Sequence, residues 1–200
     1  MDDFLTIFRG LDTHGPGTPG DTLAALALVP TDPQRILDIG CGPGNAVPTA
    51  RSANLPFAAG SFDLMWCEAS VYCMGFEAAL NHWKAFLAPD GTLVVSDLVW
   101  LRTDPPEEVR AFWADEYPDI QLLDARRAHV VANGYDLVGT HAVGHDAWAA
   151  SYEPLSDRVA EVRSSLGDAS VADALLAEVA MLKRQREGAF IDVFFVMQPR

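Results

Sequence analysis

The sequence predicts a single α/β domain built on a mainly parallel sheet, with one antiparallel strand near the C-terminus. Three short apolar runs, at residues 36–39, 64–67 and 92–96, lack polar alternation and are typical of strands buried on both faces. Segments with apolar residues at helical spacing lie between and around these runs. A chain of 200 residues suits one domain and is long enough to bury a real core.

Helices are predicted wherever apolar residues recur at helical spacing. They are expected at residues 4–11, 23–28, 77–87, 107–116 and 122–132, with one or two more within 156–186, divided near Gly167. Asp21 or Thr22 is expected to cap the second helix, because short polar side chains accept hydrogen bonds from the N–H groups of a first turn. We expect residues 1–30 to form a helical cap, and residues 100–133 and 145–187 to form lid or insert segments.

The strands follow from apolar runs that stop at turn residues. Besides the three buried runs, residues 135–143 and 189–197 predict two more strands, so the sheet is expected to have about five. A tight turn is expected at residues 89–91 (P-D-G), just before the third buried run. Asn133 and Gly134 are expected to stop the helix that precedes residue 135.

Composition and charge exclude some classes of function. The formal net charge of -14 argues against a nucleic-acid substrate, because neutralising phosphates requires clustered Lys and Arg, and it favours a small neutral or cationic ligand. The pair Arg126 and Arg127 is expected on a solvated helix face. The three cysteines lack metal-ligand spacing and are expected to be buried, reduced thiols of a cytoplasmic protein. The N-terminus does not resemble a signal peptide, and no apolar run reaches membrane-spanning length.

The most informative motif is the string at residues 36–45, I-L-D-I-G-C-G-P-G-N, in which a strand runs into glycines at alternate positions. Gly40, Gly42 and Gly44 let the backbone turn sharply and approach a ligand closely. In an open parallel sheet, ligands bind beyond the carboxyl ends of the strands, where this turn lies. The turn is expected to bind a ligand, although a tight strand–helix corner would use glycines in the same way.

Together with Asp38, this string resembles motif I of the class I S-adenosylmethionine (SAM)-dependent methyltransferases. Residues 55–68 (L-P-F-A-A-G-S-F-D-L-M-W-C-E) and 87–97 (L-A-P-D-G-T-L-V-V-S-D) resemble the segments around the fourth and fifth strands of that family. The ending F-F-V-M resembles its antiparallel last strand. The resemblance implies a Rossmann-like methyltransferase fold, SAM as cofactor, and methyl transfer to a small-molecule acceptor.

The resemblance also implies a set of site residues. Cofactor binding is implied for Asp38, Gly40, Cys41, Gly42, Gly44, Leu55 and Glu68. Glu68 and Asp97, at the ends of neighbouring strands, are implied as the catalytic residues that would orient or deprotonate the acceptor. Each carboxylate has a structural alternative: Asp38 and Asp97 would cap the turns that follow them, and Glu68 would be a solvated strand end. No metal site is expected.

Aromatic residues are further candidates for contact with a substrate. Tyr72 and Trp100 follow two of the predicted strands and would wall a substrate site. Trp113, Tyr117, Trp148 and Tyr152 would form a lid, and core packing of amphipathic helices accounts for them equally well.

One part of the family pattern is missing from the sequence. Only residues 45–54 separate Gly44 from Leu55, whereas a crossover between parallel strands needs a dozen residues or more. No carboxylate lies between Asp38 and Asp63, so the acid expected about twenty residues after such a turn has no counterpart. Three possibilities stay open: a fold shortened by two strands, a segment omitted from the sequence, or a site that holds something other than SAM.

The missing segment gives the sequence two competing functions. The first is a methyltransferase that binds SAM and a small-molecule substrate. The second is a truncated or degenerate protein of the same fold, without catalysis, that acts as a binding or scaffold domain. A homodimer or the N-terminal helices would then cover the exposed sheet edge. Neither interpretation involves nucleic acid or a membrane.

Overall fold

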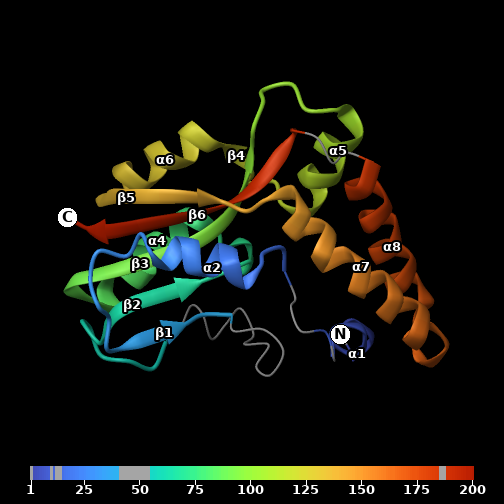
Figure 1. The fold of residues 1–200 in the computed structure, drawn as a ribbon, viewed down its shortest axis with the longest axis horizontal. Coiled ribbons are helices and arrows are strands. Elements are labelled where there is room, and N and C mark those ends of the chain that lie inside the picture. Colours follow the sequence, from blue (N-terminus) through green and yellow to red (C-terminus); the bar gives the residue numbers. More distant parts are fainter. Residues whose placement is uncertain (1, 10, 12–14, 41–54, 185–187) are drawn as a thin grey trace.

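The computed structural model describes residues 2–9, 11, 15–40, 55–184 and 188–200 (Figure 1). Within these residues, six strands form one sheet in the order β1-β2-β3-β6-β5, and β4 pairs with β3 off this path. The strands are β1 (Ile36–Asp38), β2 (Phe62–Cys67), β3 (Leu87–Trp100), β4 (Gln121–Leu122), β5 (Tyr135–Ala142) and β6 (Phe190–Pro199). Pairs β1–β2, β2–β3 and β3–β4 are parallel, and β6 runs antiparallel to β3 and β5. The predicted α/β fold, mainly parallel with an antiparallel C-terminal strand, is confirmed.

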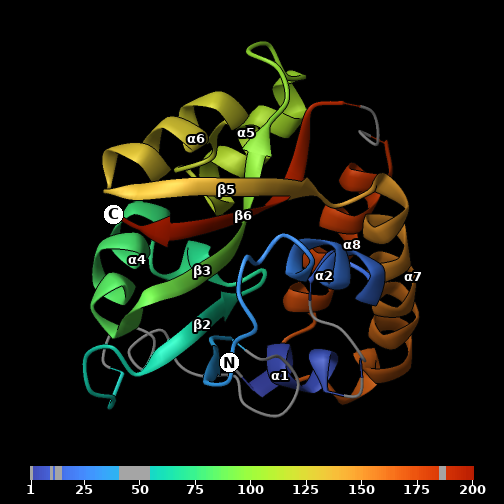
Figure 2. The same cartoon turned by 60° about the vertical axis from the view of Figure 1, so that its left-hand side comes forward.

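The helices flank the sheet on both faces and at one end (Figures 1 and 2). They are α1 (Asp2–Phe8), α2 (Pro19–Leu26), α4 (Phe76–Trp83), α5 (Glu107–Glu116), α6 (Leu123–Ala132), α7 (His145–Val162) and α8 (Ala169–Arg184). Single 3-10 turns lie at Val71–Cys73, Lys84–Phe86 and Arg163–Ser165. Helices α7 and α8 stand together at the end toward which β2 points, so they lie near the carboxyl ends of the parallel strands (Figure 1).

Side-chain alternation gives the sheet two different faces. On one face, Met65, Val95 and Phe195 pack with buried residues of α4 and α6. On the other, Trp66, Val94, Phe194 and their neighbours pack with α2, α5, α7 and α8. We call these the α4 face and the α7 face. A third apolar cluster joins α1, α7 and α8 to one another.

Strand β1 differs from its prediction as a doubly buried strand. Ile36 is 56% exposed, and Asp38 is also exposed. The physical reason is position: in the part of the chain that the structure describes, β1 pairs only with β2 and has no strand on its other side. Residues 45–54, where the missing crossover was expected, lie outside the described residues.

The predicted tight turn at residues 89–91 is wrong. Strand β3 runs without interruption from Leu87 to Trp100, and the three residues lie within it. The pairing with β2 shifts from Phe62–Leu87 to Leu64–Thr92, so β3 holds extra residues at this point. The extra residues bulge out of the ladder, which lets proline and glycine sit in a strand without breaking it.

The N-cap of α2 also differs from the prediction. Thr18 occupies it, and Pro19 follows at the first helical position, where a missing N–H costs nothing. The Thr18 hydroxyl accepts a hydrogen bond from the Asp21 amide, and the Asp21 carboxylate accepts one from the Thr18 amide. The interruption expected near Gly167 is confirmed, because α7 ends at Val162 and α8 begins at Ala169. Gly134, with a φ of 76°, follows α6 as expected of a helix stop.

Candidate functional site

The turns after β1 and β2 meet at one edge of the sheet. Gly40 follows β1 with a φ of 83°, a conformation that side-chain-bearing residues rarely adopt. A Cβ added to Gly40 would lie 2.3 Å from the Ser70 hydroxyl oxygen, so glycine is also required by space. Next to Ser70, the Ala69 amide donates a hydrogen bond of 2.8 Å to the Ser96 hydroxyl of β3. Three strands thus fix the backbone beside Glu68.

The glycine-rich N-terminal segment packs against the same edge. A Cβ on Gly15 would lie 2.5 Å from the Ala69 Cβ, and one on Gly17 would lie 2.9 Å from the Glu68 carboxylate. Thr22 of α2 donates a hydrogen bond of 3.4 Å to Glu68. The lack of side chains at these glycines therefore lets the N-terminal segment reach Glu68.

Glu68 is a partly buried carboxylate just beyond the carboxyl end of β2, where ligands bind in open parallel sheets. The indole N–H of Trp66 donates to it at 3.2 Å. Burial raises its pKa, the hydrogen bonds from Trp66 and Thr22 lower it, and the negative charges of Asp38 and Asp21 raise it again. The charges of Asp38 and Asp21, which raise the pKa of Glu68, are both negative, so a cation bound there would relieve their repulsion.

Asp38 lies at the end of β1, one strand away from Glu68. Its side chain is exposed, yet its neighbours desolvate it enough to raise its pKa. The structure brings Asp38, Gly40 and Glu68 together at one edge, as the sequence predicts. Leu55, another predicted cofactor contact, is partly buried against the hydrophobic core of the α4 face. Cys41, Gly42 and Gly44 lie outside the described residues.

Asp97 lies apart from these residues, on the α4 face of the sheet. It is 2% exposed, and both of its oxygens are engaged. The Tyr117 hydroxyl donates to Oδ1 at 2.7 Å, and Arg126 Nε lies 2.6 Å from Oδ2. The Arg126 contact is an ion pair whose N–H is not aligned as a hydrogen bond. Burial raises the pKa of Asp97 to about 6 against the opposing effects of Arg126 and Tyr117, so the carboxylate is ionised at neutral pH.

Arg126 does not lie on a solvated helix face, contrary to the prediction. It is 1% exposed, because α6 turns it inward onto Asp97. Its remaining N–H groups donate to the Asp119 carbonyl at 2.6 Å and to the Asp119 carboxylate at 3.2 Å. Its guanidinium carbon lies 4.5 Å from the centre of the Phe76 ring. A buried cation surrounded in this way satisfies the charge of Asp97 and locks α6 to β3.

Asp192 of β6 is a buried acid that the sequence reasoning missed. It is 6% exposed and lies between the core residues Phe190 and Phe194, on the α7 face, which also carries Trp66 and Glu68. Burial raises its pKa to about 8, with further contributions from the charges of Asp97 and Glu68. A signal was available, because an aspartate in the otherwise apolar string F-I-D-V-F-F-V-M contradicts the usual composition of a buried strand.

Comparison with known proteins gives a fold-level result. No protein-family model matches the chain, and no curated protein matches its sequence. Among solved structures, the chain is similar to SAM-dependent methyltransferases from Geobacter sulfurreducens and Thiobacillus denitrificans, both in complex with S-adenosyl-L-homocysteine. The TM-scores are 0.80 and 0.76, and each structure is 17% identical to the chain. The alignments cover 100% and 98% of this chain and 98% of each of those chains.

A third similar structure is a complex with two small molecules. It is the Haemonchus contortus phosphoethanolamine N-methyltransferase 2 with phosphomonomethylethanolamine and S-adenosylhomocysteine, at a TM-score of 0.70 and 15% identity. The alignment covers 98% of this chain and 57% of that one. The chain has the class I methyltransferase fold. The resemblance read from the string at residues 36–45 is therefore confirmed at the level of the fold.

Metal ligands, cysteines and membrane-spanning helices were considered in the part of the chain that the structure describes. Among the described residues, no group of three or more His, Cys, Asp and Glu is arranged to hold a metal ion. Cys67 is buried, and burial raises its thiol pKa, whereas Cys73 is exposed, contrary to the expectation of buried cysteines. No helix in the described ranges is both long and apolar enough to cross a membrane.

Proposed function

We propose that this protein transfers the methyl group of SAM to a small-molecule acceptor, and that it works in the cytoplasm. The observation that carries the proposal is the edge formed by Asp38, Gly40 and Glu68, where the glycine turn and two carboxylates meet. This edge lies at the carboxyl ends of parallel strands, where open α/β sheets bind ligands. The methyltransferase fold around it supports the same conclusion.

The described residues of the edge fit the charge of SAM. The molecule carries an α-ammonium group and a sulfonium, both cationic, and Asp38 and Glu68 are carboxylates without a described cation beside them. We propose that Asp38 and the Gly40 turn hold the methionine end, and that Glu68 lies between this end and the acceptor. Cys41, Gly42, Gly44 and Leu55 are proposed as further contacts on the basis of the sequence motif.

Methyl transfer from SAM requires the protein mainly to position the two reactants. When bound, SAM supplies a methyl group already activated by its sulfonium. The residues of this chain would align an acceptor atom with that methyl, exclude water and receive a proton. Glu68 is suited to the last task, because its pKa is raised and Trp66 and Thr22 fix its carboxylate.

Asp97 is proposed as a positioning residue instead of a base. Its two oxygens are occupied by Tyr117 and Arg126, and it faces away from Glu68 across the sheet. Tyr117 in turn packs against Tyr72, with ring centres 6.3 Å apart, beside the turn that follows β2. We therefore expect Asp97 to act on the site only through the placement of these two rings.

The proposal is tested by calorimetric titration of the full chain with SAM and S-adenosylhomocysteine. We expect saturable binding in the micromolar range, about −8 kcal/mol. Asp38→Ala and Glu68→Gln are each expected to weaken binding about tenfold, the effect of losing one charged hydrogen bond. Asp90→Asn is the matched control, because Asp90 is an exposed acid at the opposite end of β3. Absence of binding at millimolar SAM would overturn the proposal.

The scaffold function remains the second candidate because of β1. Its outer edge is unpaired within the described residues, and Ile36 is 56% exposed there. This function predicts a stable fold, no SAM binding and a homodimer that covers the edge. Sedimentation velocity on the same samples distinguishes it, since a catalytic monomer that binds SAM would exclude it.

A further inference from the structure

Asp192 has a buried carboxylate without a counter-charge among the described residues. The charged groups that raise its pKa, Asp97 and Glu68, are both acidic. Its backbone is ordinary sheet: it pairs with Leu98 of β3, and its carbonyl accepts from the Val143 amide at 2.9 Å. Burial of an unpaired acid costs free energy, so a ligand that neutralises it would bind strongly.

One phenolic group of α7 lies near Asp192, and it also lies near an acid of α8. The Tyr152 hydroxyl of α7 lies close enough to Asp192 and Glu178 for both charges to raise its pKa. Burial raises the pKa of Glu178 of α8 to about 7, and the charge of Glu116 of α5 adds to this. Acidic groups of β6 and α8 therefore both lie close to the Tyr152 hydroxyl of α7.

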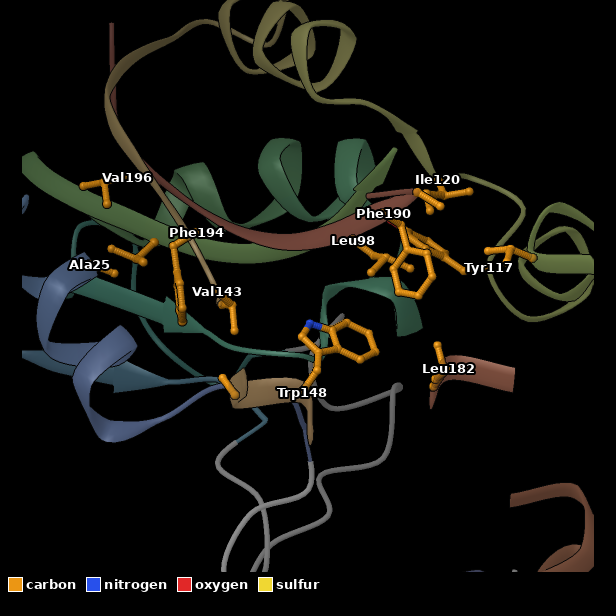
Figure 3. Close-up of a cluster of buried hydrophobic side chains, with 14 of the residues drawn as sticks. Ala25, Leu98, Tyr117, Ile120, Val143, Trp148, Leu182, Phe190, Phe194 and Val196 are labelled. Carbon is orange, nitrogen blue, oxygen red and sulfur yellow. The ribbon is translucent and has the colours of Figure 1, made fainter. Parts of the chain in front are cut away.

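Trp148 of α7 adds a second, independent sign of a missing partner. It is 9% exposed, and its indole nitrogen has no hydrogen-bond partner in the described structure. In Figure 3 this nitrogen lies on the side of the ring that faces Val143, whose amide donates to the Asp192 carbonyl. The indole packs against Phe190 and Tyr152, with ring centres 5.4 and 5.6 Å away. A buried donor, a buried acid and aromatic rings therefore surround one spot next to Glu68.

We propose that this spot, formed by Asp192, Trp148 and Tyr152, binds the nitrogen of a small amine, which is the methyl acceptor. Buried carboxylates together with aromatic faces select an ammonium group over a neutral or anionic one. The indole N–H would donate to a polar atom next to that nitrogen. The identity of the acceptor rests on the proposed methyl transfer, but the amine-binding site does not.

The proton and the electron pairs of this methyl transfer can be followed step by step. With an amine as acceptor, Asp192 takes the proton in place of Glu68: the ammonium loses one proton to the Asp192 carboxylate, which frees the nitrogen lone pair. The lone pair forms the N–CH₃ bond while the C–S bond breaks, and its electrons stay on sulfur to give S-adenosylhomocysteine. The proton then passes from Asp192 to solvent. The raised pKa of Asp192 suits this exchange near neutral pH.

The test measures binding of amines to the full chain without SAM, by calorimetry. The probes are butylamine and phenethylamine, each with the alcohol of the same skeleton as its neutral control. We expect each amine to bind at least about tenfold more tightly than its alcohol. Asp192→Asn is expected to weaken amine binding about tenfold or more and Glu178→Gln a few-fold, with alcohol binding unchanged. Asp90→Asn is the control for lost charge.

The outcomes separate this proposal from the previous one. Equal affinity for amines and alcohols, or unchanged amine binding in Asp192→Asn, would overturn the amine site. Amine binding that depends on Asp192 in a chain that fails to bind SAM would support the site and overturn methyl transfer. In a chain that binds both, transfer of labelled methyl from SAM to the amine nitrogen supports the acceptor class. Transfer only to the alcohols would contradict it.

Discussion

Asp97 and Asp192 are two buried aspartates on paired strands, and their surroundings differ completely. Asp97 pairs in register with Val193, the residue after Asp192, so the two carboxylates point to opposite faces of the sheet. On the α4 face, Arg126 and Tyr117 contact both oxygens of Asp97. On the α7 face, the charged groups described around Asp192 are acids. The two carboxylates are similarly buried, but only the charge of Asp97 is neutralised by a described cation.

The difference separates a structural acid from one that costs stability. A buried ion pair whose opposite charges neutralise each other holds its elements in one arrangement, here α6 against β3. A buried carboxylate without a cation destabilises the fold, and such a cost is tolerated chiefly at functional sites. We therefore expect the buried acid of the α4 face to stabilise the fold and that of the α7 face to bind a ligand.

The largest effect is expected for Asp97→Ala. The substitution leaves the Arg126 guanidinium buried without its main counter-charge, so the free energy of unfolding should fall by about 3–5 kcal/mol. Urea unfolding of the purified variant measures this loss. The double variant Asp97→Leu with Arg126→Met removes both charges, and it should recover most of the stability. A loss below about 1 kcal/mol for the single variant would remove Asp97 from its structural role.

Asp192→Asn should have the opposite sign. The pKa of Asp192 is raised from 3.8 to about 8 in the folded state, so folding takes up a proton between these pH values. Its stabilising contribution is complete below about pH 4 and is lost as the pH rises to about 8. At pH 7 the variant should therefore be roughly 2–4 kcal/mol more stable than the parent chain.

Unfolding of both chains across this pH range checks that expectation. The stability advantage of Asp192→Asn should be small at about pH 4 and should grow steadily to about pH 8. Glu178 remains in both chains and its pKa is about 7, so its own pH dependence cancels in the difference. An advantage that does not change with pH would mean that Asp192 has a counter-ion in solution.

Tyr117→Phe should destabilise the protein by an intermediate amount. It removes the 2.7 Å hydrogen bond to Asp97 and leaves one oxygen of a buried carboxylate without a donor. A hydrogen bond to a charged group is worth about 1.5–3 kcal/mol, and urea unfolding should show a loss in that range. SAM affinity should change little, because phenylalanine keeps the ring that packs against Tyr72. A tenfold loss of affinity would show that the hydrogen bond to Asp97, and not the ring alone, positions Tyr72 at the site.

The two faces also differ in how well the sequence predicted them. The strands and the glycine turn were predictable, because an unbroken apolar run favours a buried strand and alternate glycines favour a sharp turn at its end. Thus Asp38, Gly40 and Glu68 were placed correctly at one edge. The missing crossover predicted an exposed sheet edge, but the apolar string at residues 36–39 did not show that β1 forms it, because a buried strand and an edge strand can share one apolar string.

Local sequence patterns could not predict which side chains that are distant in the sequence pair in the fold. Arg126 stands next to Arg127 in an ordinary helical segment, and only the packing of α6 on β3 shows that one is buried and the other is not. Asp97 ends the apolar run at 92–96 and so resembles a turn cap. In the structure β3 continues to Trp100, and the aspartate becomes a core residue. Asp192 was visible in the sequence, but its significance depends on which charges surround it.

The smallest effect is expected from Thr18→Ala, which extends the comparison to α2, the helix whose Thr22 donates to Glu68. The substitution removes the hydroxyl that accepts from the Asp21 amide, so stability should fall by about 1 kcal/mol. Because Thr22 of α2 donates to Glu68, fraying of this helix should also weaken SAM binding, by roughly two- to threefold.

Asp168→Ala is the control for this prediction. It removes the carboxylate that accepts from the Ser170 amide at the start of α8, far from Glu68 along the chain. It should cost similar stability and leave SAM affinity unchanged. Equal losses of affinity in the two variants would mean that global stability, and not the placement of α2 over Glu68, sets binding at this edge.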